Sequence, residues 1–293
     1  MRFRTLMEWV GRILSLACLI LLISLVVRYH EELPAIEWSV GTVGVSGLVI
    51  LFGIVGVALN AQAWKVLMAK LQPISFLTAF SITGRSQIAK YLPGNVFHYV
   101  GKMILAQKAG LRTRIVVMSM LLEIVLLVFT ATAIGAVGYA LSDREYRLYT
   151  YLFLAVLVAI PLLWRVLKSR VPVLSEGIDR VGVGNLLRTV AWQTASLVLF
   201  GTTAYLLSRG LWPGVYALGW WEMVWAGSLA WVVGFVTPGA PGGIGVREGL
   251  LVALFSSQMG YASAATLFLA LRLVQMISDG LAFMLAVWIQ DKR

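Results

Sequence analysis

Long apolar stretches alternate with short polar segments along the chain, and six of these stretches are long enough to cross a membrane. A membrane-spanning α-helix needs about 20 consecutive, mostly apolar residues, because each residue advances it by about 1.5 Å through a hydrocarbon layer about 30 Å thick. The pattern therefore predicts an all-α integral membrane protein with six plain spans. They lie at residues 9–27, 41–64, 115–141, 147–166, 187–207 and 262–289.

Two further apolar stretches, 74–109 and 219–258, are interrupted at their centres by proline and glycine. Proline removes a backbone donor and clashes with the preceding helical turn, so neither stretch is expected to form one straight helix. We expect each to fold as a broken hairpin of two short helices that is either re-entrant or crosses the membrane twice. The residues expected to break and gate these helices are Pro93, Gly94, Pro238, Gly239, Pro241, Gly242, Gly243 and Gly245.

The two breaks occupy matching places in the chain, because Pro93 and Pro238 are 145 residues apart. Moving the sequence by this offset places every span and hairpin of residues 1–146 on a counterpart in residues 147–293. Each half then contains three plain spans and one hairpin that returns to its starting side, so each crosses the membrane an odd number of times. The second repeat is therefore expected to be inverted relative to the first, within one membrane domain and without a soluble domain. Inverted repeats with interrupted helices are typical of transporters.

Composition agrees with a membrane location. Hydrophobic residues make up 60% of the chain and charged residues only 13%, which is too little polar surface to cover a water-soluble core. Lys and Arg beside membrane spans are retained in the cytoplasm. Sixteen such residues flank one side of the predicted spans, whereas the other side has only Arg28, Arg144, Arg147 and Arg209. We expect a multi-pass protein of the plasma (inner) membrane with both termini cytoplasmic, and its net charge of +11 requires no nucleic-acid partner.

Catalytic and metal-binding patterns are missing from the sequence. Cys18 is the single cysteine and lies inside the first span, so no intramolecular disulfide or cysteine metal site is expected. We find no histidine cluster, no paired-aspartate metal motif, no Ser/His/Asp arrangement and no nucleotide-binding motif. The sequence therefore favours a protein that is not an enzyme and that uses no metal and no cofactor.

Charged residues inside apolar segments are the strongest candidates for function, because a charge at the bilayer centre costs roughly 2.5–3.5 kcal/mol and normally faces a partner or a water-filled cavity. Cations outnumber acids around the two breaks, which suggests an anionic ligand. Arg272, Gln275 and Asp279 share one face of the last span by their spacing of three and four residues. The candidate substrate-binding residues are Arg85, Lys90, Asn95, Lys102, Arg247, Glu248, Arg272 and Asp279.

Structural roles for these residues remain open alternatives. Arg272 has Glu123 and Glu248 as potential partners, and Arg247 has Asp279. Glu123 stands alone in its span and is expected to act as a counter-ion, whereas His98 is expected to be an ordinary polar lining residue. Tryptophans at 212, 220, 221, 225 and 231 are interpreted mainly as an interfacial belt, with Trp231 deepest. A short helix or loop is expected at 169–186, between the halves.

The two breaks also carry a family resemblance. RSQIAKYLPGNVFHYVGK at residues 85–102 and TPGAPGGIGVRE at 237–248 are similar to the paired motifs of the lysylphosphatidylglycerol synthase transmembrane region, a flippase-like membrane domain family. The similarity covers nearly the whole chain. It implies that the broken helices surround a headgroup path, with Arg247 and Glu248 matching the family motif. Only Asp291, Lys292 and Arg293 follow the last span, so synthase activity is not expected.

The resemblance implies a lipid flippase that moves a phosphate-bearing lipid between leaflets, either an aminoacyl-phospholipid or a polyprenyl-phosphate-linked intermediate. The first break has more cations, so we expect it to bind the phosphate, and the glycine-rich second break to supply close backbone approach and movement. Two alternatives remain: a transporter of a small soluble anion, and a lipid-binding partner of a glycan or lipid assembly enzyme that transports nothing. A lipid- or glycan-synthesising membrane enzyme is accordingly a candidate partner, and the sequence leaves the oligomeric state undetermined.

Overall fold

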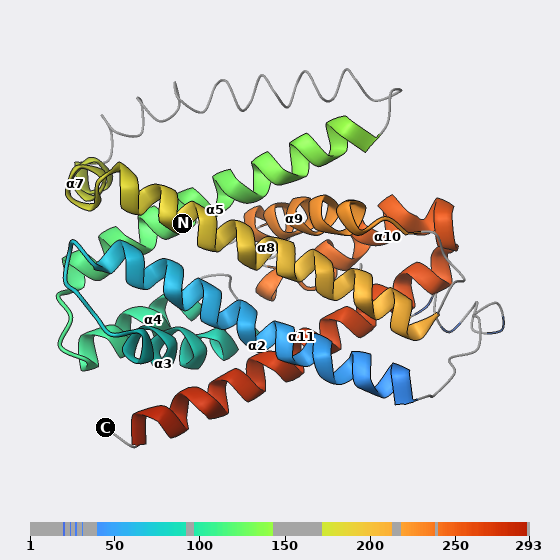
Figure 1. The fold of residues 1–293 in the computed structure, drawn as a ribbon, viewed down its shortest axis with the longest axis horizontal. Helices are drawn as coiled ribbons and strands as arrows, with labels where there is room; N and C mark the ends of the chain where they lie inside the picture. The colour runs from blue at the N-terminus through green and yellow to red at the C-terminus, as the bar shows by residue number, and fades with distance from the viewer. Residues whose placement is uncertain are drawn as a thin grey trace, which may run out of the picture.

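The computed structural model describes residues 40–91, 97–142, 172–212, 218–237 and 240–291, together with residues 20, 24, 27 and 31. Within these ranges every regular element is a helix, which confirms the all-α prediction (Figure 1). The predicted spans at 9–27 and 147–166 lie outside the continuous described ranges. So do Pro93, Gly94, Asn95, Pro238 and Gly239.

Four helices of the described chain are long and apolar enough to cross a membrane: α2 (Val40–Met68), α5 (Thr113–Ser142), α8 (Val183–Leu211) and α11 (Tyr261–Asp291). They contain the predicted spans at 41–64, 115–141, 187–207 and 262–289. A helix of 29 residues is about 44 Å long, so each can cross the hydrocarbon layer even when tilted. In Figure 1 the four helices run roughly along the long axis of the molecule.

The first interrupted stretch consists of α3 (Phe76–Gln87), the 3-10 turn η2 (Ile88–Tyr91) and α4 (Phe97–Lys108). The α3 helix begins after Ser75, whose Oγ accepts a hydrogen bond from the Thr78 N–H at 3.2 Å, as an N-cap residue does. Its α-helical geometry ends before the prolyl break. Short helices are thus present where the sequence predicted a broken hairpin.

The second interrupted stretch consists of α9 (Trp220–Val236), the 3-10 turn η3 (Pro241–Gly243) and α10 (Val246–Met259). Gly245 precedes α10 with a φ of 81°, a left-handed conformation that glycine adopts without a steric penalty. In Figure 1 the α3 and α4 helices lie toward the end of the molecule where α2 ends and α5 begins, whereas α9 and α10 lie toward the opposite end.

Helix contacts in the two halves correspond to one another under the 145-residue offset. The offset relates α2 to α8, α3 to α9, α4 to α10 and α5 to α11. The α5 helix packs on α9 as α11 packs on α3, and α2 packs on α3 as α8 packs on α9. Likewise α3 contacts α4 as α9 contacts α10, α4 contacts α5 as α10 contacts α11, and α2 contacts α8 directly. The packing of the long and short helices is therefore equivalent in the two halves.

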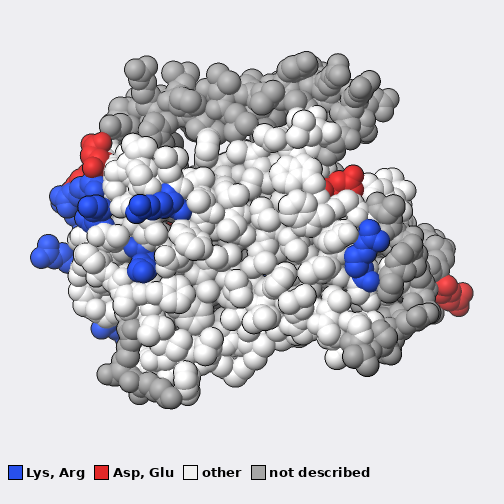
Figure 2. Space-filling view, viewed as in Figure 1, with Lys and Arg blue, Asp and Glu red and all other residues white. Residues whose placement is uncertain are grey.

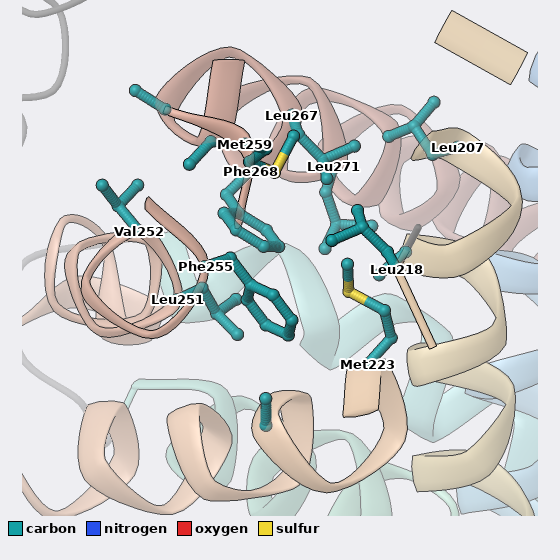
Figure 3. Close-up of a cluster of buried hydrophobic side chains, with 14 of the residues drawn as sticks. Leu207, Leu218, Met223, Leu251, Val252, Phe255, Met259, Leu267, Phe268 and Leu271 are labelled. Carbon is teal, nitrogen blue, oxygen red and sulfur yellow. The ribbon is translucent and has the colours of Figure 1, made fainter. Parts of the chain in front are cut away.

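Two main apolar clusters hold these helices together. The larger joins α8, α9, α10 and α11, and includes Met223, Leu251, Phe255 and Phe268 (Figure 3). The other joins α2, α3, α4, α5 and the end of α11. Gly84 of α3 lies against α11 so closely that an added Cβ would be 3.0 Å from the Ala286 Cβ. Small residues allow such close helix contacts where lipid supplies no hydrophobic driving force.

Basic side chains gather at one end of the molecule, as Figure 2 shows at its left. This is the end where α2 finishes and α5 and α8 begin, and it carries exposed Lys70, Arg112, Arg114 and Arg188. The predicted connection between the halves contains the short helix α7 (Pro172–Val181), in which Glu176 forms ion pairs with Arg114 at 2.5 Å and Arg180 at 2.6 Å. One cation of the predicted basic face is placed elsewhere, because Lys102 is buried.

The predicted tryptophan belt was wrong for two of its members. Trp212 and Trp225 are buried, with exposed fractions of 2% and 6%, whereas Trp220 and Trp221 are exposed. Trp225 packs edge-on against Tyr139 of α5, so it joins two helices instead of facing the membrane surface.

Candidate functional site

A cavity of about 240 Å³ lies between the two interrupted hairpins. All four long helices, all four short helices and both 3-10 turns contribute to its wall. Those lining residues that belong to the long helices come from near the middle of each: 52–60 of α2, 123–127 of α5, 196–203 of α8 and 272–279 of α11. The middle of a helix that spans a membrane lies near the centre of the bilayer.

Residues beside the first break are bound to α11 through an ion pair and a hydrogen bond. Lys90 Nζ lies 2.6 Å from the Asp279 Oδ2 atom, and the Tyr91 hydroxyl donates a hydrogen bond to the same oxygen at 2.5 Å. Gln87 also accepts a hydrogen bond from Lys90 at 3.3 Å. Asp279 is 5% exposed, so its charge is balanced within the protein.

Lys102 forms a second ion pair, with Glu123 of α5. The Lys102 Nζ and Glu123 Oε2 atoms are 2.6 Å apart, and the two side chains are 6% and 12% exposed. The ammonium group also lies 4.3 Å from the ring centre of Trp64, a cation–π contact. Glu123 therefore has the counter-ion position that the sequence predicted for it.

Arg272 connects α11 to the second break. Its two terminal nitrogens both donate hydrogen bonds to the Gly242 carbonyl, at 3.2 Å each. Its Nη1 atom is also 3.7 Å from Glu248 Oε1. A Cβ at Gly242 would be 3.0 Å from Arg272 Nη2 and 3.4 Å from the Lys90 carbonyl oxygen. The flanks of the two breaks thus meet at this glycine.

Glu248 fixes the start of α10 and stands behind the cavity wall. Its Oε2 atom accepts a hydrogen bond from the Gly245 N–H at 2.7 Å, which satisfies a donor at the helix N-terminus. The other carboxylate oxygen faces Arg272. Glu248 does not line the cavity, so its observed contacts are with the protein.

Arg247 is the cavity cation without a carboxylate partner among the described residues. Its stem passes between Gly234 of α9 and Gly243 of η3: an added Cβ at either glycine would be 2.5 Å from an Arg247 atom. The guanidinium group lies 5.6 Å from the ring centre of Trp231, which also lines the cavity. The buried Arg247 Nε atom has no hydrogen-bond partner in the described chain.

Three other lining residues also have a buried polar atom without a partner in the described chain: Thr83 Oγ1, His98 Nδ1 and Arg272 Nε. Buried polar atoms are nearly always hydrogen-bonded in proteins, so four such atoms in residues that line one cavity are an unusual concentration. His98 lines the cavity, as the sequence predicted.

The cavity wall contains both charged and apolar residues. Charged side chains come chiefly from η2, α4, α10 and α11. Many of the apolar lining residues belong to α5, α8 and α9: Ile124, Leu127, Leu197, Leu199, Phe200, Trp231 and Phe235. Trp231 and Phe235 stack with ring centres 5.1 Å apart and planes 7° from parallel. The site is therefore amphipathic.

The structure brings together five of the eight sequence-predicted substrate residues at the cavity: Lys90, Lys102, Arg247, Arg272 and Asp279. Gln275 joins them, as the helical spacing predicted. Arg85 does not line the cavity and Glu248 lies behind its wall. Asn95 is outside the described residues.

Sequence reasoning missed a polar pair in the wall. Asn60 of α2 donates a hydrogen bond to Ser196 of α8 at 3.0 Å, and both line the cavity. Asn60 is an amide within an apolar span, and a polar side chain in such a setting is itself a signal of function. Tyr91 was also missed, since an aromatic residue beside a break is hard to distinguish from a packing residue.

No group of three or more metal-ligating side chains occurs in the part of the chain that the structure describes. Among known proteins, no family model and no curated protein matches this chain. The function must therefore be argued from the cavity itself.

Proposed function

We propose that the protein moves a phosphate-bearing anionic lipid between the two leaflets, with the headgroup passing through the cavity. The observation that carries the proposal is a set of four cationic side chains around one cavity at the middle of the long helices: Lys90, Lys102, Arg247 and Arg272. Arginine donates several hydrogen bonds in a plane and suits phosphate oxygens. The four unpartnered polar atoms supply further contacts that a headgroup would satisfy.

The amphipathic wall favours a lipid over a small soluble anion. A soluble anion is bound best by polar contacts all around it, whereas Phe200, Leu127 and the Trp231–Phe235 stack add apolar surface to this cavity. Such a surface suits the glycerol backbone and the first methylene groups of a lipid. The charged lining residues would replace the hydrogen bonds to water that the phosphate loses on entering the cavity.

The full architecture that we propose has six plain spans, two broken hairpins and two inverted repeats, with both termini in the cytoplasm. The corresponding helix contacts of the two halves support this proposal, as does the basic end of the molecule. The hairpins lie toward opposite ends, so each would open the cavity to one leaflet. Transport would then proceed by alternating access.

The proposal is tested by lipid movement in proteoliposomes that contain phosphatidylglycerol with a fluorescent acyl chain. Dithionite destroys the label in the outer leaflet, and further loss reports movement from the inner leaflet. We expect Arg247→Ala and Arg272→Ala to slow this loss by at least about tenfold, because each removes a charge-assisted contact to phosphate. Arg188→Gln, at the exposed basic end, is the matched control and should transport normally.

Unchanged lipid movement in both cavity variants would contradict the proposal. Efflux of trapped inorganic phosphate in place of lipid movement would instead favour a soluble-anion transporter. Lipid binding without movement by the wild-type protein would favour a non-transporting lipid-binding partner of an assembly enzyme.

A further inference from the structure

Seven described charged side chains lie in the cavity wall or directly behind it. Four are cations: Lys90, Lys102, Arg247 and Arg272. Three are carboxylates: Glu123 and Asp279 in the wall, and Glu248 behind Arg272. The described site therefore has an excess of one positive charge. The undescribed breaks beside it, residues 92–96 and 238–239, contain no ionisable residue, so they do not alter this balance.

The ion pairs locate the excess charge on one residue. Lys90 is paired with Asp279 and Lys102 with Glu123, each at 2.6 Å, and Arg272 has Glu248 at 3.7 Å. Arg247 contacts Trp231 and two glycines, and although Glu248 acts on it electrostatically, it forms no ion pair with a described carboxylate. Its Nε atom is buried and unpartnered. A ligand that binds here has one positive charge available to neutralise.

We propose that the site selects a headgroup with a net charge of minus one, supplied by a single phosphodiester without a compensating cation, and that Arg247 binds it. This inference rests on the proposed function and narrows its substrate class. A phosphodiester has one negative charge throughout the neutral pH range. A phosphomonoester approaches two charges because its second pKa is about 6, and a diphosphate has at least two. The extra charge of such a ligand would have no partner in a cavity of low dielectric constant, where it is costly.

The test is a set of variants with different cavity charges, assayed against lipids of different headgroup charge. Three lipids with identical acyl chains serve as probes at pH 8: phosphatidylcholine (net charge zero), phosphatidylglycerol (one negative charge) and phosphatidic acid (a phosphomonoester). Binding to the purified full-length protein is measured by native mass spectrometry in pairwise competition. Glycerophosphoglycerol, the headgroup without tails, reports whether the phosphodiester alone is enough.

The wild-type protein should prefer phosphatidylglycerol over each of the other two lipids by at least about tenfold, because an uncompensated charge at this depth is expensive. Arg247→Gln brings the cavity charge to zero and should abolish the preference over phosphatidylcholine. Arg247→Lys retains the charge and should retain that preference. Glu123→Gln raises the cavity charge to +2 and should move the preference toward phosphatidic acid.

A paired control separates charge from folding. The double variant Lys102→Met with Glu123→Gln removes both partners of one ion pair and leaves the cavity charge at +1. Binding of all three lipids is expected to weaken, because Lys102 lines the cavity, but their order of preference should remain that of the wild type. If Glu123→Gln fails to yield a folded protein by gel filtration, Asp279→Asn provides the same change of charge at the other ion pair.

The results distinguish this inference from the proposed function. A wild-type protein that moves lipids but prefers phosphatidic acid, or binds the two anionic lipids equally, would contradict selection by headgroup charge. It would not contradict the proposed lipid transport. A preference that does not follow the cavity charge across the variants would overturn it as well. Failure to bind or move any of the three lipids would count against the proposed function itself. Displacement of bound lipid by glycerophosphoglycerol would make the phosphodiester, without acyl tails, the recognised group.

Discussion

Lys102 and Arg247 are related by the 145-residue offset, yet their electrostatic surroundings differ. Lys102 is held at 2.6 Å by Glu123. The position related to Glu123 by the same offset is Phe268, which is 1% exposed and packs against Phe255. Arg247 therefore has no counterpart of the carboxylate that neutralises Lys102. Corresponding helices therefore hold a neutral ion pair at Lys102 and, at Arg247, a cation without an acidic ion-pair partner among the described residues.

The same asymmetry recurs around the cavity. Lys90 corresponds to Phe235 and Arg272 corresponds to Leu127 under the offset, and all four line the cavity. Each charge thus has an apolar residue at the related position of the other half. Charged residues of one half and apolar residues at the related positions of the other half thus line the same cavity. Lys90 and Lys102 of the first hairpin have acid partners, whereas Arg247 of the second hairpin has no ion-pair partner among the described residues, which favours Arg247 as the group that binds phosphate.

The largest expected effect comes from removing each of the two related cations. Lys102→Met leaves Glu123 buried without its partner, and breaking such a pair costs about 3–5 kcal/mol. Arg247→Met leaves no described carboxylate unpaired, so its unfolding temperature should remain at or above that of the wild type while phosphatidylglycerol binding is lost. Thermal unfolding in detergent measures the difference. If the two substitutions lowered the unfolding temperature equally, the proposed electrostatic difference between Lys102 and Arg247 would be wrong.

A smaller effect is expected from alanine at a glycine of each hairpin. Gly243→Ala forces a non-glycine residue to a φ of 73° and places a Cβ 2.5 Å from Arg247 Nε, and the left-handed strain alone is about 1–2 kcal/mol. The protein should be less stable and should lose lipid transport. Gly101→Ala in α4 is the control, because its nearest neighbour would be 3.8 Å away and alanine favours a helix by about 1 kcal/mol. A Gly243→Ala protein with normal transport would show that the narrow space between Gly234 and Gly243 does not position Arg247.

The smallest effect is expected from Tyr91→Phe, which removes the hydrogen bond to Asp279 and retains the ring beside Arg272. We expect a loss of about 1 kcal/mol in unfolding free energy, the usual size for one hydrogen bond. The second break should be unaffected, because Arg272 still holds the Gly242 carbonyl. Hydrogen exchange of η2 and η3 amides measures this separation. Faster exchange at η3 to the same extent as at η2 would show that the two breaks open together.

Much of the fold could be predicted from the sequence because hydrophobic length and proline are local signals. The four described long helices and the short helices beside the breaks follow from apolar runs of spanning length and from their interruption. Five cavity residues were found because a charge in an apolar segment is conspicuous. The burial of Trp212 and Trp225 was not found, because an indole has the same appearance in a sequence whether it faces lipid headgroups or a neighbouring helix.

The sequence by itself determined the apolar helices of spanning length and the surplus of cations, and it predicts the 145-residue repeat, since these depend only on residue type and spacing. Which cation lacks a partner was decided by the tertiary structure. Lys90 and Asp279 are 189 residues apart in sequence and Arg272 and Glu248 are 24 apart, so composition could not assign the pairs. Ion pairing depends on distances of a few ångströms between different helices. Only the packing of the helices places Arg247 between Gly234 and Gly243, without an ion-pair partner among the described carboxylates.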